Sequence, residues 1–372
     1  MNKFICLLSI LVMTLSVGCK SVNKQAGDDD RSVIKIGLVF PVTGNQSVST
    51  TDALNAAKMA IKEIQEDPNA KYRYEAIVED NMSELKRTAF SANKLIAVDK
   101  VDAIISVMSA HGSVISPLAE RAKTIHFGIG SDKSTFKGLY NFLCYLEPKK
   151  QAYGLIKGIK DQNFTRVALV FQNQAGVLSF VDEIKKSIRD NDIEVVVDES
   201  FNPGEVQFQS IISKILHRSP EIVIMQSFPP ELGIFYKQLR RVSNIPFTSN
   251  WIAVSGSDTY MFEGCNFVTA NWPIPEDLRA KYVDVFKKEP GNVWVSEFYI
   301  MTELLISAYE NTPLREGHSK PVNEDVVNTF LAIKNLYSSV GTVSVEEDGI
   351  IQPPLTINTV KDGKIVVLET VK

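Results

Sequence analysis

The chain has 372 residues, of which 44% are hydrophobic and 23% are charged, and its formal net charge is −4. This length suits a protein of two domains, and the hydrophobic fraction is sufficient for two packed cores. Binding of nucleic acid needs a positively charged surface, so the net negative charge argues against nucleic acid as a partner. After residue 19, no apolar run is long enough to cross a membrane.

Residues 1–19 have the pattern of a signal peptide. Lys3 gives a minimal basic start, and the apolar core from Phe4 to Val17 is shorter than the roughly 20 residues that cross a bilayer. The segment ends Leu15-Ser16-Val17-Gly18-Cys19, which resembles a bacterial lipoprotein signal and implies that Cys19 is lipidated. Such signals favour leucine three residues before the cysteine, where this chain has Ser16, so an ordinary secretory signal is the alternative. Two or more acyl chains would anchor the protein stably, since each buried methylene contributes about 0.8 kcal/mol.

Residues 20–32 are polar and charged, with an acidic run at Asp28-Asp29-Asp30. The segment has no apolar face to bury, so we expect a disordered tether. Three consecutive aspartates lack the alternating spacing and the glycine of a calcium loop, which argues against a calcium site.

A strand, a polar loop and a helix open the folded part of the chain. Ile34 to Phe40 is a short run of apolar, branched residues, as in a strand that is buried on both faces. Pro41 and Gly44 end this strand. In the helix predicted from Thr51 to Glu66, apolar residues recur every three or four positions. Such a unit opens a doubly wound α/β domain, whose ligands bind beyond the carboxyl ends of the strands, here at residues 43–50.

The sequence from Ile34 to Gly44, IKIGLVFPVTG, resembles the opening of periplasmic binding proteins of the leucine/isoleucine/valine-binding type. The resemblance continues through weaker agreements, in the same order of elements, from about Val33 to the C-terminus. It implies an α/β fold of two doubly wound lobes joined by a three-segment hinge. The implied boundaries are residues 33–147 and 273–346 for lobe 1, and residues 148–272 and 347–372 for lobe 2.

The rest of the chain alternates between strand and helix patterns. In lobe 1 these patterns predict strands at 72–80, 103–108, 125–130 and 141–146, and helices at 83–98 and 113–122. In lobe 2 they predict strands at 166–172, 194–197, 222–226, 247–252 and 267–272, and helices at 178–190, 208–216 and 231–241. The C-terminal part is predicted to hold helices at 292–310 and 323–334, and strands at 341–345, 355–360 and 365–368.

The loop after the strand at 103–108 has the residues of an anion site. In Ser109-Ala110-His111-Gly112-Ser113, small hydroxyl residues precede a helix whose first N–H groups lack acceptors. By the resemblance, Ser109 lies where amino-acid-binding relatives hold the carboxylate of the ligand. The alternative is a helix N-cap, a role for which Ser113 is better placed. Of the four histidines, His111 is the one placed for chemistry or ligand contact in the cleft, and the alternative is a histidine that is satisfied by neighbouring groups or solvated.

The strand at 125–130 ends Gly128-Ile129-Gly130-Ser131-Asp132. Relatives contact the ligand here through backbone groups and a final threonine, so the resemblance implies that Gly130, Ser131 and Asp132 face the cleft. Asp132 stands in place of that threonine, where it would repel a carboxylate and attract a cation. Helix capping by Asp132 is the alternative.

In lobe 2 the chain departs from the family that it resembles. Phe228 aligns with one aromatic ligand contact, but another aligns with Gly176, and the acidic residue that holds the ligand ammonium aligns with Trp251. A buried ammonium without a charged partner costs several kcal/mol. We therefore expect a ligand other than a plain aliphatic α-amino acid. Interlobe packing is the alternative role for Trp251.

Together these positions predict a pocket between the lobes, formed by Ser109, Asp132, Phe228, Trp251 and either Ser49 or Gln46 from the first loop. Aromatic faces near a carboxylate suit a cationic or aromatic small molecule, since cation–π contacts contribute about 0.5–2 kcal/mol.

The sequence gives no signature of an enzyme, a cofactor site or a metal site. It lacks GxSxG, Walker and HExxH motifs, and Lys133 stands where a dinucleotide fingerprint beginning at Gly128 needs its third glycine. The four histidines show no metal-ligand spacing. Cys144 and Cys265 suit neither a metal site nor a redox pair, although they could form one disulfide in an oxidising compartment. We therefore expect no catalytic activity, no cofactor and no metal.

The resemblance implies a lipid-anchored solute-binding protein of an ABC importer, held at the periplasmic or extracellular face of the bacterial cell envelope. It would capture a small polar ligand between its lobes and present it to a membrane permease, with the lipid as its only attachment to the membrane. Related domains also serve as receptor ectodomains and as lipoprotein regulators of cell-wall synthesis. The alternative is therefore a tethered sensor or regulator without transport, whose partner would be a sensor kinase or a cell-wall enzyme.

Overall fold

The computed structural model describes residues 30–333, 336–338, 341–343 and 345–371. The chain divides into a unit of residues 1–31, of which only Asp30 and Arg31 are described, and a unit of residues 32–372. Everything below concerns the second unit. The predicted signal peptide, the predicted lipidation site Cys19 and most of the predicted tether lie outside the described residues.

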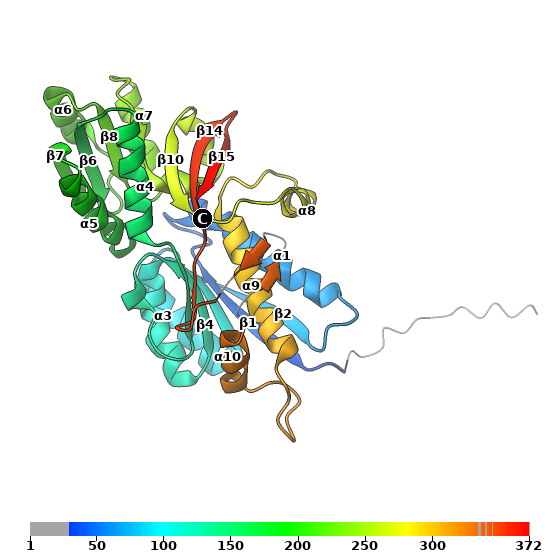
Figure 1. Ribbon diagram of the computed structural model, residues 1–372. Coiled ribbons are helices and arrows are strands. Elements are labelled where there is room, and N and C mark those ends of the chain that lie inside the picture. The colour runs from blue at the N-terminus through cyan, green and yellow to red at the C-terminus, as the bar shows by residue number, and fades with distance from the viewer. Residues whose placement is uncertain (1–29, 334–335, 339–340, 344, 372) are drawn as a thin grey trace, which may run out of the picture. The chain divides into compact units, whose positions relative to one another are not determined.

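Lobe 1 is built on a six-stranded parallel sheet in the order β13-β5-β4-β3-β1-β2 (Figure 1). Its strands are β1 (Val33–Phe40), β2 (Arg73–Asp80), β3 (Ala103–Val107), β4 (Ile125–Gly130), β5 (Asn141–Tyr145) and β13 (Ile350–Ile351). Its helices are α1 (Ser47–Glu66), α2 (Leu85–Lys94), α3 (Ser109–Ala122), α8 (Glu276–Phe286), α9 (Trp294–Asn311) and α10 (Asn323–Leu331). A hairpin of β11 (Leu336–Ser338) and β12 (Gly341–Val343) follows α10.

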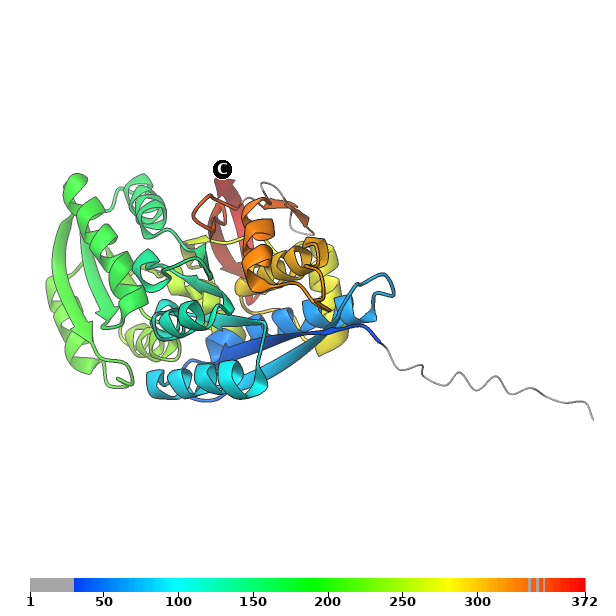
Figure 2. The ribbon, with the colours of Figure 1, turned by 90° about the horizontal axis from the view of Figure 1, so that it is seen from below.

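Strand β1 shows why helices cover both faces of this sheet. Leu38 and Phe40 belong to the large core, which includes side chains of α1, α9 and α10, whereas Val39 belongs to a smaller core with side chains of α2 and α3. Successive side chains of a strand point to opposite faces. Helices α1, α9 and α10 therefore lie on one face and α2 and α3 on the other (Figure 2). This arrangement confirms the doubly covered strand predicted at residues 34–40.

A buried carboxylate fixes α1 to the segment that leads into α9. Asp52 of α1 is 3% exposed. Its Oδ1 accepts hydrogen bonds from Tyr282 Oη and Lys288 Nζ, each at 2.6 Å, and its Oδ2 accepts from the N–H of Gly291 at 3.0 Å. These bonds set the position of the first residue of α9, Trp294, which contributes to the site described below.

Lobe 2 holds a parallel sheet in the order β7-β6-β8-β9 and an antiparallel sheet in the order β10-β14-β15 (Figure 1). Its strands are β6 (Arg166–Gln172), β7 (Glu194–Phe201), β8 (Ile222–Gln226), β9 (Phe247–Thr248), β10 (Asn266–Ala270), β14 (Leu355–Lys361) and β15 (Lys364–Val371). Its helices are α4 (Pro148–Asp161), α5 (Ala175–Asp190), α6 (Gln209–Arg218) and α7 (Glu231–Arg240). Helix α4 packs against α5 and β10. No helix of the described residues is both long and apolar enough to cross a membrane.

The chain passes between the two lobes three times: between β5 and α4, between β10 and α8, and between β13 and β14. Because β13 pairs with β5 in the sheet of lobe 1, the third passage falls at residues 352–354, after the predicted boundary at residue 347. A strand as short as Ile350–Ile351 leaves no periodicity from which to assign it. The N–H of Asn271 donates to the carbonyl oxygen of Pro354 at 3.0 Å, which joins the second and third passages.

Most predicted elements coincide with the observed ones within a few residues, but α4 and β13 were not predicted, α1 begins earlier than predicted and β7 ends later, and three further elements differ as follows. The helix predicted from residue 113 begins earlier, at Ser109. Its first turn of Ser, Ala, His and Gly carries no apolar periodicity, so the sequence pattern did not reveal it. The strand predicted at 247–252 ends at Thr248 and gives way to a 3-10 helix, Asn250–Val254, which the Ser249 side chain caps. The helix predicted at 83–98 ends at Lys94 and continues as a π-helical turn.

The two cysteines considered for a disulfide are free and buried. Cys144 lies in β5 of lobe 1, whereas Cys265 lies immediately before β10 of lobe 2. The predicted disulfide alternative is therefore wrong for this structure.

Candidate functional site

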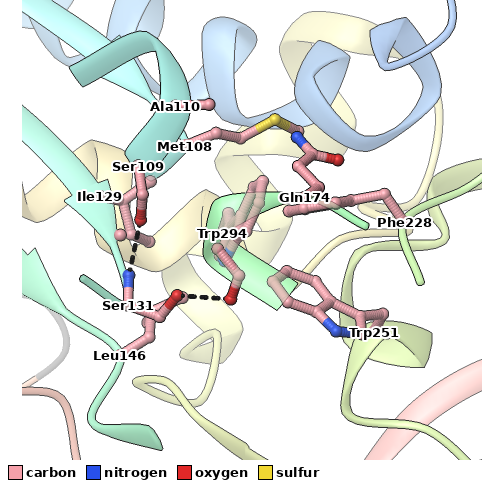
Figure 3. Close-up of a pocket in the computed structure, with 12 residues that line it drawn as sticks. Met108, Ser109, Ala110, Ile129, Ser131, Leu146, Gln174, Phe228, Trp251 and Trp294 are labelled. Carbon is pink, nitrogen blue, oxygen red and sulfur yellow. Dashed lines mark hydrogen bonds between the residues drawn. The ribbon is translucent and has the colours of Figure 1, made fainter. Parts of the chain in front are cut away.

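A small cavity lies between the lobes, where strands of both sheets reach their carboxyl ends (Figure 3). We call it the interlobe cavity. It is lined by Met108, Ser109, Ala110, Ile129, Gly130, Ser131, Leu146, Gln174, Gly176, Phe228, Trp251 and Trp294. As the lobes stand, the space open to the centre of a water molecule is about 10 Å³, which admits about one water. A larger solute therefore requires the lobes to move apart.

The first turn of α3 lies against this cavity. Met108, between β3 and α3, has φ 72° and ψ 138°, a conformation that residues other than glycine rarely adopt, and it turns the chain sharply from strand to helix. The N–H of Gly112 donates to the carbonyl oxygen of Met108, so the N–H groups of Ser109 and Ala110 have no acceptor within the helix. Ser113, the predicted N-cap, instead lies inside the helix, where its Oγ donates to the carbonyl oxygen of Ala110 at 2.8 Å.

Ser109, Gly130 and Ser131 form a polar wall of the cavity. The N–H of Ser131 donates to Ser109 Oγ at 3.0 Å, and both serine side chains are buried. A Cβ at Gly130 would lie 2.6 Å from Ser109 Oγ, so the close approach of the two strands' ends requires glycine here. The structure thus brings together three of the residues that the sequence placed in the cleft.

Ser131 also joins lobe 1 to lobe 2. Its Oγ donates to the carbonyl oxygen of Gly176, in the first turn of α5, at 2.8 Å (Figure 3). The same Oγ accepts from Ser179 Oγ at 3.0 Å. We call Ser131, Gly176 and Ser179 the interlobe latch. A Cβ at Gly176 would lie 3.6 Å from Ser131 Oγ and 3.7 Å from Ser109 Oγ, so a large side chain at this position would press on the polar wall.

Two aromatic side chains of lobe 2 close another side of the cavity. The ring centroids of Phe228 and Trp251 lie 4.0 Å apart, and Phe180 of α5 packs edge-on against Trp251 at 5.4 Å. Both Phe228 and Trp251 are buried. The indole Nε1 of Trp251 has no hydrogen-bond partner among the described residues. The two aromatic residues predicted for the pocket therefore line it, and both ring contacts of Trp251 are with side chains of lobe 2.

Asp132, predicted as the charged residue of the pocket, does not line the cavity. Its Oδ1 accepts a hydrogen bond from the N–H of Ser134 at 2.9 Å and thereby caps the 3-10 turn Lys133–Thr135. Asp132 therefore has the capping role that was the alternative. A cationic ligand was predicted from a carboxylate in the pocket, and the lining does not contain that carboxylate.

His111 and Ser49 are also buried away from the lining. His111 Nδ1 lies 2.8 Å from Thr88 Oγ1, and its Nε2 lies 3.2 Å from Gln46 Oε1. Burial lowers the pKa of His111 to about 4, so the imidazole is neutral at physiological pH. Ser49 lies in the first turns of α1, and its Oγ has no hydrogen-bond partner among the described residues.

Seven lining residues were not among the ligand-binding residues predicted from the sequence: Met108, Ala110, Ile129, Leu146, Gln174, Gly176 and Trp294. The signal for Gln174 was its place just after the strand predicted at 166–172, at the carboxyl end of a strand in lobe 2. No such signal marked Trp294, because the first residue of an apolar helix is expected to pack in the hydrophobic core. It reaches the cavity only through the long-range contacts that fix the start of α9.

None of the twelve lining residues carries an ionisable side chain. The lysine next to Asp132, Lys133, has its Nζ 4.7 Å from the centre of the Tyr145 ring. Within the described part of the chain, no three His, Cys, Asp or Glu side chains cluster in a way that could hold a metal ion. The site is therefore a neutral, mostly apolar cavity whose lining side chains bear hydroxyl, amide and indole N–H groups as their polar groups, beside the backbone.

Comparison with known proteins identifies relatives over most of the chain. Residues 33–364 match the family model described as periplasmic binding protein. The Leu/Ile/Val-binding protein BraC3 of Rhizobium johnstonii is 22% identical over 357 residues, which cover 90% of this chain and 94% of that protein.

Solved structures share the fold at lower identity. The branched-chain amino acid transporter substrate-binding protein LivJ of Streptococcus pneumoniae, in complex with isoleucine, superposes with a TM-score of 0.79 at 18% identity, covering 91% of this chain and 99% of that one. An ABC-transporter solute-binding protein of R. palustris in complex with benzoate also has a TM-score of 0.79, at 16% identity, covering 91% of this chain and 96% of that one. These likenesses confirm the predicted type of two-lobed α/β fold.

Proposed function

The chain belongs to the periplasmic binding protein family, and from that premise we propose that it binds a small solute in the interlobe cavity and delivers it to the permease of an ABC importer. The observation that carries this proposal is the cavity itself. It lies at the carboxyl ends of strands from both lobes, where ligands of open α/β sheets bind, and both lobes contribute to its lining. The proposed activity is binding, without covalent chemistry.

Closure of the lobes would couple binding to recognition by the permease. Three chain passages form the hinge, and the bonds of the interlobe latch connect the two lobes directly. A solute shifts the balance between open and closed lobes only through contacts that are better in the closed form. The cavity lining supplies such contacts, because Ser109 and Ser131 come from lobe 1 whereas Phe228 and Trp251 come from lobe 2.

The proposal includes the anchor and the compartment. Lipidation at Cys19 and a tether of residues 20–32 would hold the folded unit at the outer face of a bacterial membrane, within reach of a permease. The apolar segment that ends in the Leu15-to-Cys19 sequence supports this part of the proposal.

The solute is proposed to differ from a plain aliphatic α-amino acid. Trp251 occupies the position predicted for the acidic residue that holds an ammonium, and no lining residue supplies a carboxylate in its place. Among relatives of this fold, one is named for leucine, isoleucine and valine, and one was solved with benzoate. The fold therefore accommodates carboxylates both with and without an α-ammonium group.

A thermal-unfolding screen tests the proposed function. The full-length protein, purified in mild detergent, would be melted with amino acids, polyamines, betaines, nucleosides, amides and carboxylic acids, and followed by intrinsic tryptophan fluorescence. A solute at about 100 times its dissociation constant stabilises the folded protein by about 2.7 kcal/mol, a readily measured shift. A clear shift supports a solute receptor. No shift across the panel would favour the alternative, a tethered sensor or regulator that binds a protein partner.

A further inference from the structure

We infer that the interlobe cavity takes a small monocarboxylate with an apolar body and no ammonium group. The inference rests on the proposed function, because it concerns the solute that the same cavity would bind. Three features of the lining carry it: the lack of ionisable side chains, hydrogen-bond donors gathered on one wall, and apolar surface elsewhere.

An ammonium group would find no charged partner in this cavity. The lining holds no aspartate or glutamate. Asp132, which follows the polar wall directly in sequence, uses its carboxylate 2.9 Å from the N–H of Ser134 to cap a turn. Burying an ammonium without a carboxylate is unfavourable, because the protein does not replace its lost hydration. Neither a zwitterionic amino acid nor an amine therefore suits the cavity.

The polar wall instead offers hydrogen-bond donors to an anion. Ser109 Oγ already accepts from the N–H of Ser131 at 3.0 Å, and no described residue accepts its own hydroxyl proton. The N–H groups of Ser109 and Ala110 lie beside it at the start of the 14-residue helix α3, where the helix dipole favours negative charge. Trp251, on another side of the cavity, has a buried Nε1 with no acceptor among the described residues, and it is not part of this wall. A carboxylate could accept from this wall without any cationic side chain.

The remaining lining suits an apolar body. Its apolar side chains are Met108, Ile129, Leu146, Phe228, Trp251 and Trp294. All six are buried, and the rings of Phe228 and Trp251 lie in contact at 4.0 Å between centroids. Removing an aliphatic or aromatic group from water onto such surface is favourable in proportion to the apolar area buried. The separation of the lobes limits the size of the solute, and the polar wall determines which charge the solute can carry.

Two matched sets of probes test this inference by isothermal titration calorimetry on the full-length protein in mild detergent. The first set is 4-methylpentanoate, L-leucine and 3-methylbutylamine, which share one body and carry the carboxylate alone, both groups, or the ammonium alone. The second set is 3-phenylpropanoate, L-phenylalanine and 2-phenylethylamine. We expect at least one acid to bind. Its matched amino acid and amine should bind at least about tenfold more weakly, because burying one unpaired charge costs more than the roughly 1.4 kcal/mol that corresponds to a tenfold change in affinity.

Two variants on the same helix locate the binding. Ser109→Ala removes the hydroxyl donor and should weaken the acid by about tenfold or more, as expected for a hydrogen bond to a charged group. Ser113→Ala is the matched control, because Ser113 is exposed and bonds only within α3. Equal losses in both variants would contradict a role for the polar wall, because they would indicate a general disturbance of the helix.

The outcomes separate this inference from the proposed function. Binding of the acids alone supports both. Tighter binding of an amino acid or an amine overturns the carboxylate class but leaves the solute-receptor proposal in place. Failure of all six probes, while a solute of the thermal screen other than a carboxylic acid binds, also overturns the carboxylate class and leaves the solute-receptor proposal in place; binding of another monocarboxylate from that screen supports both. Failure of every solute in both experiments overturns the proposed function, and this inference with it.

Discussion

Ser131 of lobe 1 and Gly176 of lobe 2 are joined by a hydrogen bond of 2.8 Å from a serine hydroxyl to a backbone carbonyl. The two lobes are therefore in direct polar contact beside the cavity, and a solute that enters must compete with this contact or be accommodated next to it. This contact stabilises the arrangement of the lobes that the structure shows, without a solute.

Ser131→Ala should shift the lobes toward the open form. Ser179 Oγ also lies 3.0 Å from the carbonyl oxygen of Gly176 and can donate its one proton there once the Ser131 hydroxyl is gone, so the variant leaves that acceptor paired and loses about 1 kcal/mol. About fivefold more open protein is the expected result, measured as a larger radius of gyration by small-angle X-ray scattering or as a longer distance between labels on the two lobes. Ser134→Ala, an exposed serine of the same loop, is the control. A radius that is the same in both variants would show that the latch does not hold the lobes.

Gly130→Ala should damage the polar wall through a steric clash. The new Cβ would lie 2.6 Å from Ser109 Oγ and 3.4 Å from its backbone, and relief requires the hydroxyl to move out of its bond with Ser131. Overpacking of this kind costs about 1–3 kcal/mol, measured as the free energy of unfolding in urea. The double variant with Ser109→Ala should regain part of this loss, because removal of the Oγ relieves the closest contact. Strictly additive costs would contradict the clash.

Gln174→Glu should change which charge the cavity tolerates. Gln174 is the lining residue whose substitution adds a carboxylate with almost no change of shape. The added negative charge should weaken 4-methylpentanoate by about tenfold and improve the binding of L-leucine or 3-methylbutylamine, as expected for the introduction of one close charge. Calorimetry with the same three probes measures both changes. Unaltered affinities would mean that Gln174 does not face the bound solute.

Glu303 of α9 should make stability fall as the pH rises. Burial, with the charge of Glu63 as a smaller cause, raises the pKa of Glu303 to about 7, and its Oε2 has no partner among the described residues. The folded protein therefore holds a proton that the unfolded chain, with a carboxyl pKa of about 4.3, releases. The stability contributed by this proton is fully present below about pH 4 and is lost between there and about pH 7.

Urea unfolding at pH 5 and pH 8 measures this dependence. The free energy of unfolding of the natural protein should fall between pH 5 and pH 8, and Glu303→Gln should make that fall smaller by about 2 kcal/mol. Glu75→Gln, at an exposed glutamate of β2, should leave the loss as it is in the natural protein. If both variants retain the same pH dependence, Glu303 is not protonated in the folded state.

The sequence predicted the elements better than it predicted the site. Period and composition located β1 and α1, because a doubly covered strand and an amphipathic helix leave strong patterns over many residues. The same signals fail for β13, which has only two residues and is held by its pairing with β5. They fail again in the first turn of α3, whose conformation depends on the strained backbone of Met108.

Within the site, position along the strands was more informative than residue chemistry. Ser109, Ser131, Phe228 and Trp251 line the cavity because they follow strands whose carboxyl ends meet there. Asp132 also follows such a strand, but a local hydrogen bond to Ser134 turns its carboxylate away, and sequence alone does not weigh that bond against a ligand. The neutral character of the cavity emerged only from the directions of the side chains.

The acceptor at the centre of the latch is a main-chain atom, and this has a consequence for how the protein can diverge. A larger side chain at position 176 would narrow the cleft, but no substitution there removes the carbonyl oxygen that lies within hydrogen-bond distance of the Ser131 and Ser179 hydroxyls. Only the two hydroxyl positions can lose the contact by a single codon change. In descendants of this gene, serines retained at residues 131 and 179 would thus indicate that the contact between the lobes has been kept. The size of the side chain at residue 176 would indicate how large a solute the cleft can hold.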